Sequence, residues 1–99
     1  MRQHSYYVYI LTNLMKTVVY VGLTNSLERR VQEHKADALG ARKTYTGRYN
    51  CYYVVYMEHF KYINNAIARE KEIKSWTREK KNKLISEFNP GWKFLNESW

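Results

Sequence analysis

The chain has 99 residues and a formal net charge of +8, and 44% of its residues are hydrophobic. This length predicts a single domain over residues 1–99, and the hydrophobic fraction excludes a wholly disordered chain. The positive charge favours a polyanionic partner, and nucleic acid is favoured over a membrane because no apolar run approaches the roughly 20 residues of a spanning helix.

The cysteine content and the first residues bear on the compartment. Cys51 is the one cysteine, which excludes an internal disulfide and a cysteine-based zinc cluster. The stretch from Met1 to Tyr7 is too polar to open a signal peptide. We therefore expect a cytoplasmic protein.

The first half of the chain predicts a β-hairpin followed by a helix. Residues 6–12 and 18–24 are rich in β-branched and aromatic side chains, so each is predicted to be a strand. The short loop between them predicts an antiparallel hairpin. Asn25 or Ser26 can cap a helix that ends near Ala38.

The second half predicts one further strand and two helices. In order, we expect a loop over 39–48, a strand over 50–60, a helix from a cap at Asn64 or Asn65 to about Trp76, and a helix ending at Phe88. Asn89-Pro90-Gly91 then breaks the last helix. The predicted order is β-β-α-β-α-α.

Two polar residues interrupt the apolar face of the first predicted helix. The 3.6-residue period places Leu27, Val31 and Ala38 in one stripe, and Arg30 and His34 fall inside it. Burial of such groups without partners is expensive, so both are expected to have a partner within the fold.

Glu70 produces the same anomaly on the second predicted helix, at the centre of a stripe formed by Ile63, Ala66, Ile67 and Ile73. A carboxylate in this position must meet a cation or a metal, or be protonated.

The hairpin carries a related feature at Gly22. A glycine inside a strand leaves space without a side chain, which often marks the close approach of a ligand or another backbone. Tyr20 lies on the same face of its strand as Gly22, and Tyr9 lies on the other strand.

The alternative for each of these residues is structural. Arg30 and Glu70 could form a half-buried salt bridge, His34 could be a core histidine, and Tyr9 and Tyr20 could be packing aromatics of the sheet. The coincidence of these residue types around one centre favours a functional site.

Tyr7-Val8-Tyr9 followed by Tyr20-Val21-Gly22 resembles the paired motif of the GIY-YIG nuclease family. Tyr7 replaces the first glycine of the motif, and valine replaces both isoleucines. The resemblance covers nearly the whole chain and is closest to small stand-alone bacterial members. It implies an α+β fold in which helices flank a three-stranded antiparallel sheet.

Other positions of the family pattern have counterparts in the chain. Arg30 lies eight residues past Gly22, at the place of the family's arginine, and His34 matches a histidine found in several family nucleases. Glu70 matches the metal-binding glutamate. Asn89 matches a polar residue, usually asparagine, that follows further on.

The resemblance implies a metal-dependent endonuclease that hydrolyses phosphodiester bonds in DNA, with a part in repair or recombination. A single carboxylate, Glu70, favours one Mg²⁺ or Mn²⁺ over a two-metal site. Family precedent implies that Tyr9 activates water, that Arg30 holds the scissile phosphate and that Tyr20 orients water or phosphate. His34 is the alternative base, because its ordinary pKa lies near neutrality and that of tyrosine is about 10.

Basic residues near this centre predict a nucleic-acid surface with salt-sensitive, sequence-independent binding. The candidates are Arg29, Lys35, Arg42, Lys43, Arg48 and Lys74. Because 99 residues leave no room for a separate DNA-reading domain, we expect recognition of DNA shape, or delivery by a partner protein. The rival functions are a catalytically inactive nucleic-acid-binding module of the same fold and an interaction domain whose polar stripe is a structural salt bridge.

Overall fold

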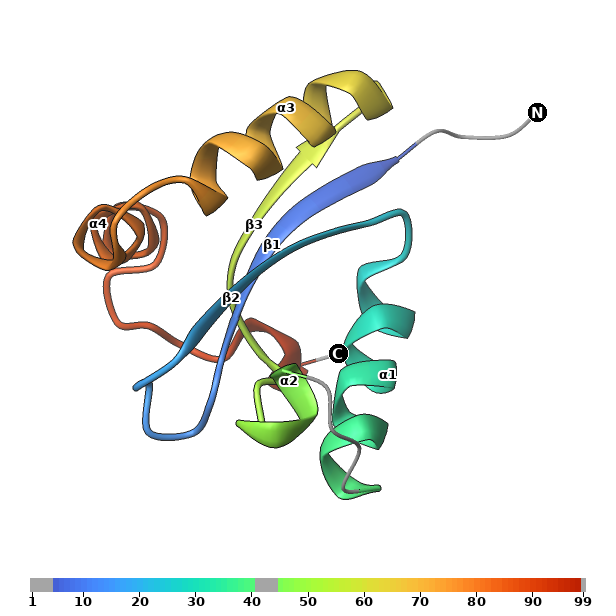
Figure 1. The fold of residues 1–99 in the computed structure, drawn as a ribbon, viewed down its shortest axis with the longest axis vertical. Coiled ribbons are helices and arrows are strands. Elements are labelled where there is room, and N and C mark those ends of the chain that lie inside the picture. Colours follow the sequence, from blue (N-terminus) through green and yellow to red (C-terminus); the bar gives the residue numbers. More distant parts are fainter. Residues whose placement is uncertain (1–4, 41–44, 99) are drawn as a thin grey trace.

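The computed structural model describes residues 5–40 and 45–98. Its elements are β1 (Tyr6–Thr12), β2 (Val19–Thr24), α1 (Leu27–Leu39), α2 (Tyr45–Arg48), β3 (Tyr53–Phe60), α3 (Ile63–Lys74), α4 (Arg78–Phe88) and a 3-10 helix, η1 (Leu95–Ser98). The strands form one antiparallel sheet in the order β2-β1-β3 (Figure 1). The predicted α+β fold with a three-stranded antiparallel sheet is confirmed.

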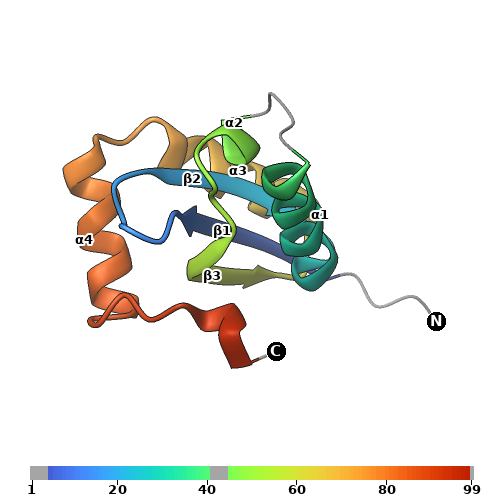
Figure 2. The same ribbon diagram turned by 90° about the horizontal axis from the view of Figure 1, so that it is seen from below.

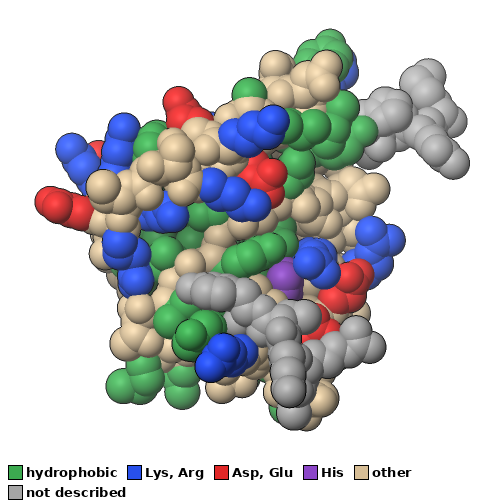
Figure 3. Space-filling view, in the orientation of Figure 1, with side chains coloured by type: hydrophobic (Ala, Val, Ile, Leu, Met, Phe, Trp, Pro, Cys, Tyr) green, Lys and Arg blue, Asp and Glu red, His purple; other side chains and the backbone are tan. Residues whose placement is uncertain are grey.

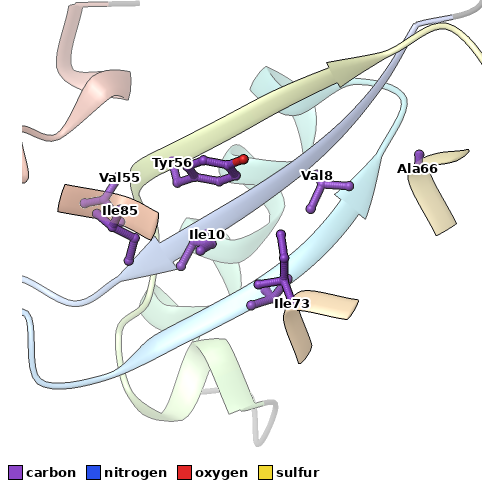
Figure 4. Packing of buried hydrophobic residues seen from close by; sticks show 8 residues of the cluster. Val8, Ile10, Val55, Tyr56, Ala66, Ile73 and Ile85 are labelled. Atoms are coloured by element: carbon purple, nitrogen blue, oxygen red, sulfur yellow. The ribbon is translucent and has the colours of Figure 1, made fainter. Parts of the chain in front are cut away.

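The central strand, β1, presents alternate residues to two hydrophobic clusters, as the period of a strand requires. Val8 and Ile10 pack with α3 and α4, and Tyr9 and Leu11 pack with α1. The first cluster contains Val8, Ile10, Val21, Val55, Tyr56, Ala66, Ile73 and Ile85 (Figure 4). The sheet is therefore covered on both faces, and Figure 2 shows α1 and α4 at opposite sides of it.

Hydrogen bonds within the turn between β1 and β2, and others from α4, stabilise this turn. The Asn13 side-chain oxygen accepts hydrogen bonds from the backbone N–H groups of Thr17 and Val18, at 2.8 and 3.1 Å. Lys16 adopts the left-handed conformation that the turn needs, with φ of 59°. Arg78 at the start of α4 donates to the carbonyl oxygens of Thr17 and Lys16, at 2.9 and 3.3 Å. This contact joins the hairpin to the last long helix.

The structure corrects the predicted start of α3. The helix begins at Ile63, with Tyr62 as its N-cap and no side-chain cap hydrogen bond. Asn64 and Asn65 lie in the first turn, so the prediction that one of them caps the helix was wrong. The Ala66 N–H donates to the Tyr62 carbonyl at 3.2 Å, and Ala66 is fully buried. Burial of Ala66 against the sheet requires this earlier start.

The segment predicted as a loop over 39–48 contains the one-turn helix α2 at its end. Asn50 follows in the left-handed conformation, with φ of 57°, which no strand residue adopts. β3 therefore starts at Tyr53 instead of residue 50. Among residues 5–40 and 45–98, no helix is long and apolar enough to cross a membrane.

The burial pattern of α3 predicts unequal effects of two isoleucine truncations. Ile73→Ala, at a fully buried position, is expected to lower the free energy of unfolding by about 2–5 kcal/mol, because it leaves a cavity. Ile63→Ala is the matched control on the same helix, and its side chain is 39% exposed. The control should cost less than about 1 kcal/mol. Urea denaturation measures both, and equal losses would contradict the packing described.

Candidate active site

The phenol ring of Tyr9 lies directly over Gly22. The two residues are cross-strand partners in β1 and β2. A Cβ atom added to Gly22 would stand 2.4 Å from both Cζ and the hydroxyl oxygen of Tyr9, so only glycine admits the ring here. The expectation that Gly22 leaves room for a ligand or another backbone was therefore wrong, because the space is filled by Tyr9. The ring is almost wholly buried as a result, with 1% exposure.

The Tyr9 hydroxyl begins a buried chain of hydrogen bonds. Its oxygen lies 3.1 Å from Nε2 of His34, and Nδ1 of the same ring lies 2.7 Å from Oγ1 of Thr46. His34 is 1% exposed, and Thr46 is also buried. The helical period thus correctly placed His34 on the inner face of α1. The sequence did not predict a role for Thr46 on α2, because a single threonine in a basic stretch follows no hydrophobic period.

The rings of Tyr9 and Tyr20 both meet His34 edge-on. The centroid distances to His34 are 6.1 Å for Tyr9 and 5.6 Å for Tyr20. Edge-to-face contacts of this kind fix ring orientation. The structure therefore brings both motif tyrosines to the same histidine.

Burial keeps the two central groups of this chain uncharged at neutral pH. Removal from water, reinforced by Tyr20, raises the pKa of Tyr9 to about 12, although the Arg30 guanidinium acts in the opposite direction. Burial, followed by the positive charge of Arg30, lowers the pKa of His34 to about 4. A neutral phenol thus faces a neutral imidazole, in which one nitrogen is free to accept a proton.

Arg30 connects this buried chain to the surface. The positive charge of its guanidinium acts to lower the pKa of the Tyr9 phenol, and its Nη1 lies 3.0 Å from the Glu33 carboxylate. The Arg30 side chain is 37% exposed. The sequence left open a salt bridge between Arg30 and Glu70. In the structure, Arg30 pairs instead with Glu33, one turn away on the same helix. Arg30 therefore acts electrostatically on the phenol and is also accessible to solvent.

Glu70 belongs to α3, which packs against β2 and β1. Its side chain is 19% exposed and pairs with Lys74 at 3.2 Å, so the cation that its position demanded is Lys74. The charge of Glu70 also acts on Tyr9 and raises the pKa of its phenol slightly. The helices that carry Arg30 and Glu70, α1 and α3, thus pack on opposite faces of the sheet (Figure 1).

The single carboxylate of Glu70 fits a hard cation that keeps most of its water. No group of three or more His, Cys, Asp or Glu side chains able to hold a metal occurs within the described ranges. One carboxylate with partial exposure, Glu70, suits Mg²⁺ or Mn²⁺ completed by water and phosphate oxygens. It does not suit a closed zinc site.

Asn89 stands apart from this group and holds the backbone. Its amide nitrogen donates to the carbonyl oxygens of Val55 and Lys93, at 3.1 and 2.9 Å, and its oxygen accepts from the Lys93 N–H at 3.1 Å. The pairing of β1 with β3 shifts register at Val55, so that carbonyl needs a partner outside the ladder. Both amide protons of Asn89 are thus committed to the scaffold.

The predicted nucleic-acid residues are distributed over α1, α2 and α3, and those described are exposed. Arg29 pairs with Glu33 at 3.6 Å, and Lys35 and Arg48 lie over the rings of Tyr52 and Tyr49. Arg42 and Lys43 lie outside the described residues. Lysine and arginine side chains gather over α3 and α4 and beside α1 in Figure 3.

The contact between Tyr9 and Gly22 predicts the effect of a single methyl group. Gly22→Ala is expected to destabilise the fold by roughly 1–3 kcal/mol through overpacking and to displace the Tyr9 ring. Gly91→Ala is the control, because an added Cβ there comes no closer than 3.7 Å to Lys93. It should change stability by about 0.5 kcal/mol or less. Urea denaturation and near-ultraviolet circular dichroism test both, and a harmless Gly22→Ala would refute the contact.

The low pKa of His34 predicts a pH dependence of stability. Because the folded pKa is about 4 and the unfolded value about 6.5, the unfolded chain binds more protons between these values. The free energy of unfolding should therefore decrease as the pH is lowered, by about 2 kcal/mol between roughly pH 7.5 and roughly pH 5. His34→Gln should reduce this fall, and the control His59→Gln, at an exposed position, should leave it unchanged. The midpoint of urea denaturation, measured at several pH values, tests this prediction. The same pH dependence in His34→Gln as in the unaltered protein would contradict a buried neutral imidazole.

Comparison with known proteins assigns the family. The model of the GIY-YIG catalytic domain matches residues 5–84. A UPF0213 protein of Haloquadratum walsbyi is 42% identical over 82 residues, which cover 83% of this chain and 88% of that protein. A UPF0213 protein of Staphylococcus haemolyticus is 38% identical, over 84% of this chain and 96% of the relative. The solution NMR structure of the UPF0213 protein BH0048 from Bacillus halodurans has a TM-score of 0.57 and 30% identity, and covers 94% of this chain and 95% of that one. This chain therefore belongs to the GIY-YIG family of nuclease domains.

Proposed function

We propose that this protein is a divalent-metal-dependent endonuclease that hydrolyses phosphodiester bonds in DNA and selects its substrate by structure instead of sequence, in repair or recombination. The observation that carries the proposal is the buried Tyr9 hydroxyl, which lies 3.1 Å from Nε2 of the neutral His34 imidazole and within the electrostatic influence of the charged Arg30 guanidinium. Glu70 lies on α3, across the sheet from α1, and its charge acts on the same phenol. A purely structural core has no need of a charged guanidinium beside a buried phenol.

Tyr9 and His34 act in series in the proposed mechanism. With a pKa raised to about 12, Tyr9 is not a phenolate at neutral pH, so it cannot take a proton from water unaided. Nε2 of His34, 3.1 Å away, accepts the phenol proton as the phenol oxygen takes one from water. The resulting hydroxide attacks phosphorus and the bond to the leaving sugar oxygen breaks. That oxygen takes a proton from solvent water, while the proton of the attacking water remains on the imidazole. This sequence assigns the base function to the pair.

Arg30 couples substrate binding to that proton transfer. It leaves Glu33 to hold the scissile phosphate through two N–H groups, a geometry that guanidinium suits. The positive charge of Arg30 helps to lower the pKa of His34, so its neutralisation by phosphate makes His34 a better proton acceptor. The same movement uncovers the Tyr9 hydroxyl, which is otherwise buried. Tyr20, beside His34, orients the water or the phosphate.

Glu70 holds the divalent cation in this proposal, and Asn89 supports the scaffold instead of contacting the phosphate. Lys74, now 3.2 Å from Glu70, must turn away to a DNA phosphate when the carboxylate is used. When bound, Mg²⁺ or Mn²⁺ would offset the negative charge that develops on the phosphoryl oxygens. The exposed Arg29, Lys35 and Arg48 add salt-sensitive contacts with the DNA backbone.

Removal of one carboxylate tests the proposal. Labelled linear, branched and single-stranded DNA are incubated with the protein and Mn²⁺, and EDTA should abolish cleavage. Glu70→Gln should reduce the rate by about 10²-fold or more with DNA binding retained. Glu79→Gln on α4 is the matched control for an exposed carboxylate and should cleave normally. Full activity in Glu70→Gln would reveal a contaminant, whereas binding without cleavage by the unaltered protein would favour the inactive nucleic-acid-binding module.

A further inference from the structure

His34 has a second hydrogen-bond partner that lies outside the family motif. Nδ1 of its ring is 2.7 Å from Oγ1 of Thr46, and both residues are buried. A neutral imidazole carries one N–H, and the partner of one nitrogen determines which nitrogen holds the proton. The role of Thr46 therefore depends on the direction of this hydrogen bond.

The other end of the chain sets that direction. The buried Tyr9 hydroxyl carries a proton that needs an acceptor, and the Arg30 guanidinium, whose charge acts on this phenol, can only donate. If Nε2 of His34 were protonated, it too could only donate. The buried hydroxyl proton of Tyr9 would then have no acceptor among the contacts described for Tyr9. A bare Nε2 removes this conflict, because it accepts from the Tyr9 hydroxyl at 3.1 Å.

The backbone around Thr46 holds the hydroxyl in place. The Cys51 N–H donates to the Thr46 carbonyl at 2.9 Å, and the Cys51 side chain is fully buried in the cluster that packs against α1. Asn50, in the left-handed conformation, closes the turn through a hydrogen bond to the Gly47 carbonyl. The segment that leads into β3 therefore fixes Thr46 relative to α1.

We propose that Thr46 is a positioning residue that accepts a hydrogen bond from Nδ1–H of His34 and so keeps Nε2 free for the Tyr9 proton. The inference rests on the proposed nuclease function for its purpose, but the tautomer can be measured without it. Substitution of Thr46 removes neither the base nor the phosphate ligand. It changes how often the imidazole carries its proton on the nitrogen that the reaction needs.

Nitrogen NMR of the His34 ring tests the tautomer directly near pH 7. In the unaltered protein we expect the signature of a protonated Nδ1 and a bare Nε2. Thr46→Val keeps the branched shape and removes the hydroxyl, so it should shift the population towards protonated Nε2. Thr46→Ser restores the hydroxyl and should return the original spectrum. Protonated Nε2 in the unaltered protein, or an unchanged tautomer in Thr46→Val, would overturn the proposal, and the first result requires no variant to fold.

Cleavage with Mn²⁺ gives the second readout. Thr46→Val should lower the single-turnover rate by about 10–100-fold, the range of losses when an orienting partner of a histidine is removed, with DNA affinity unchanged. Thr46→Ser should recover most of the rate. Equal rates for all three proteins would overturn the positioning role. If the unaltered protein cleaves no DNA, the nuclease proposal fails, while the NMR result still decides the tautomer.

Discussion

The contact between the Tyr9 ring and Gly22 is the constraint on which the site depends. With no side chain at Gly22, the phenol crosses the strand pair and its hydroxyl reaches His34 in the middle of α1. Cluster residues of α1, including Val31, pack on this same face of the sheet, which presents His34 to the hydroxyl. One missing methyl group in β2 thereby determines where a tyrosine from β1 meets a histidine from α1.

That geometry has an electrostatic consequence. Burial makes Tyr9 a weaker acid and His34 a weaker base than either is in water, so their resting state is neutral and stable beside the Arg30 charge. In the proposed mechanism, a DNA phosphate neutralises this charge. Substrate binding and proton acceptance would then be coupled through Arg30, and the buried pair would need no preformed phenolate. Glu70 belongs to α3, which packs on the other face of the sheet, and in the proposal a cation held there would offset the negative charge by which Glu70 raises the pKa of Tyr9.

Much of this arrangement was predictable because it follows strong periodic patterns. Alternation along β1 and the helical period of α1 placed Tyr9 and His34 on inner faces, and the family motif supplied Arg30 and Glu70. Side-chain partners were not predictable, because they depend on rotamers and on distant segments: Arg30 pairs with Glu33. The filled space at Gly22 and the backbone role of Asn89 likewise arise from packing between elements. The burial of Thr46 was not predictable either, because it lies in a segment without a hydrophobic period.

The central claim is that Tyr9 and His34 move one proton as a unit, and a double-variant cycle tests it most directly. Single-turnover cleavage is measured for Tyr9→Phe, His34→Gln and the double variant, with folding and DNA binding checked for each. Either substitution alone should reduce the rate by about 10²-fold or more. If both act on the same proton, the double variant should be no slower than the slower single variant. Losses that multiply in the double variant would show independent functions and contradict the account.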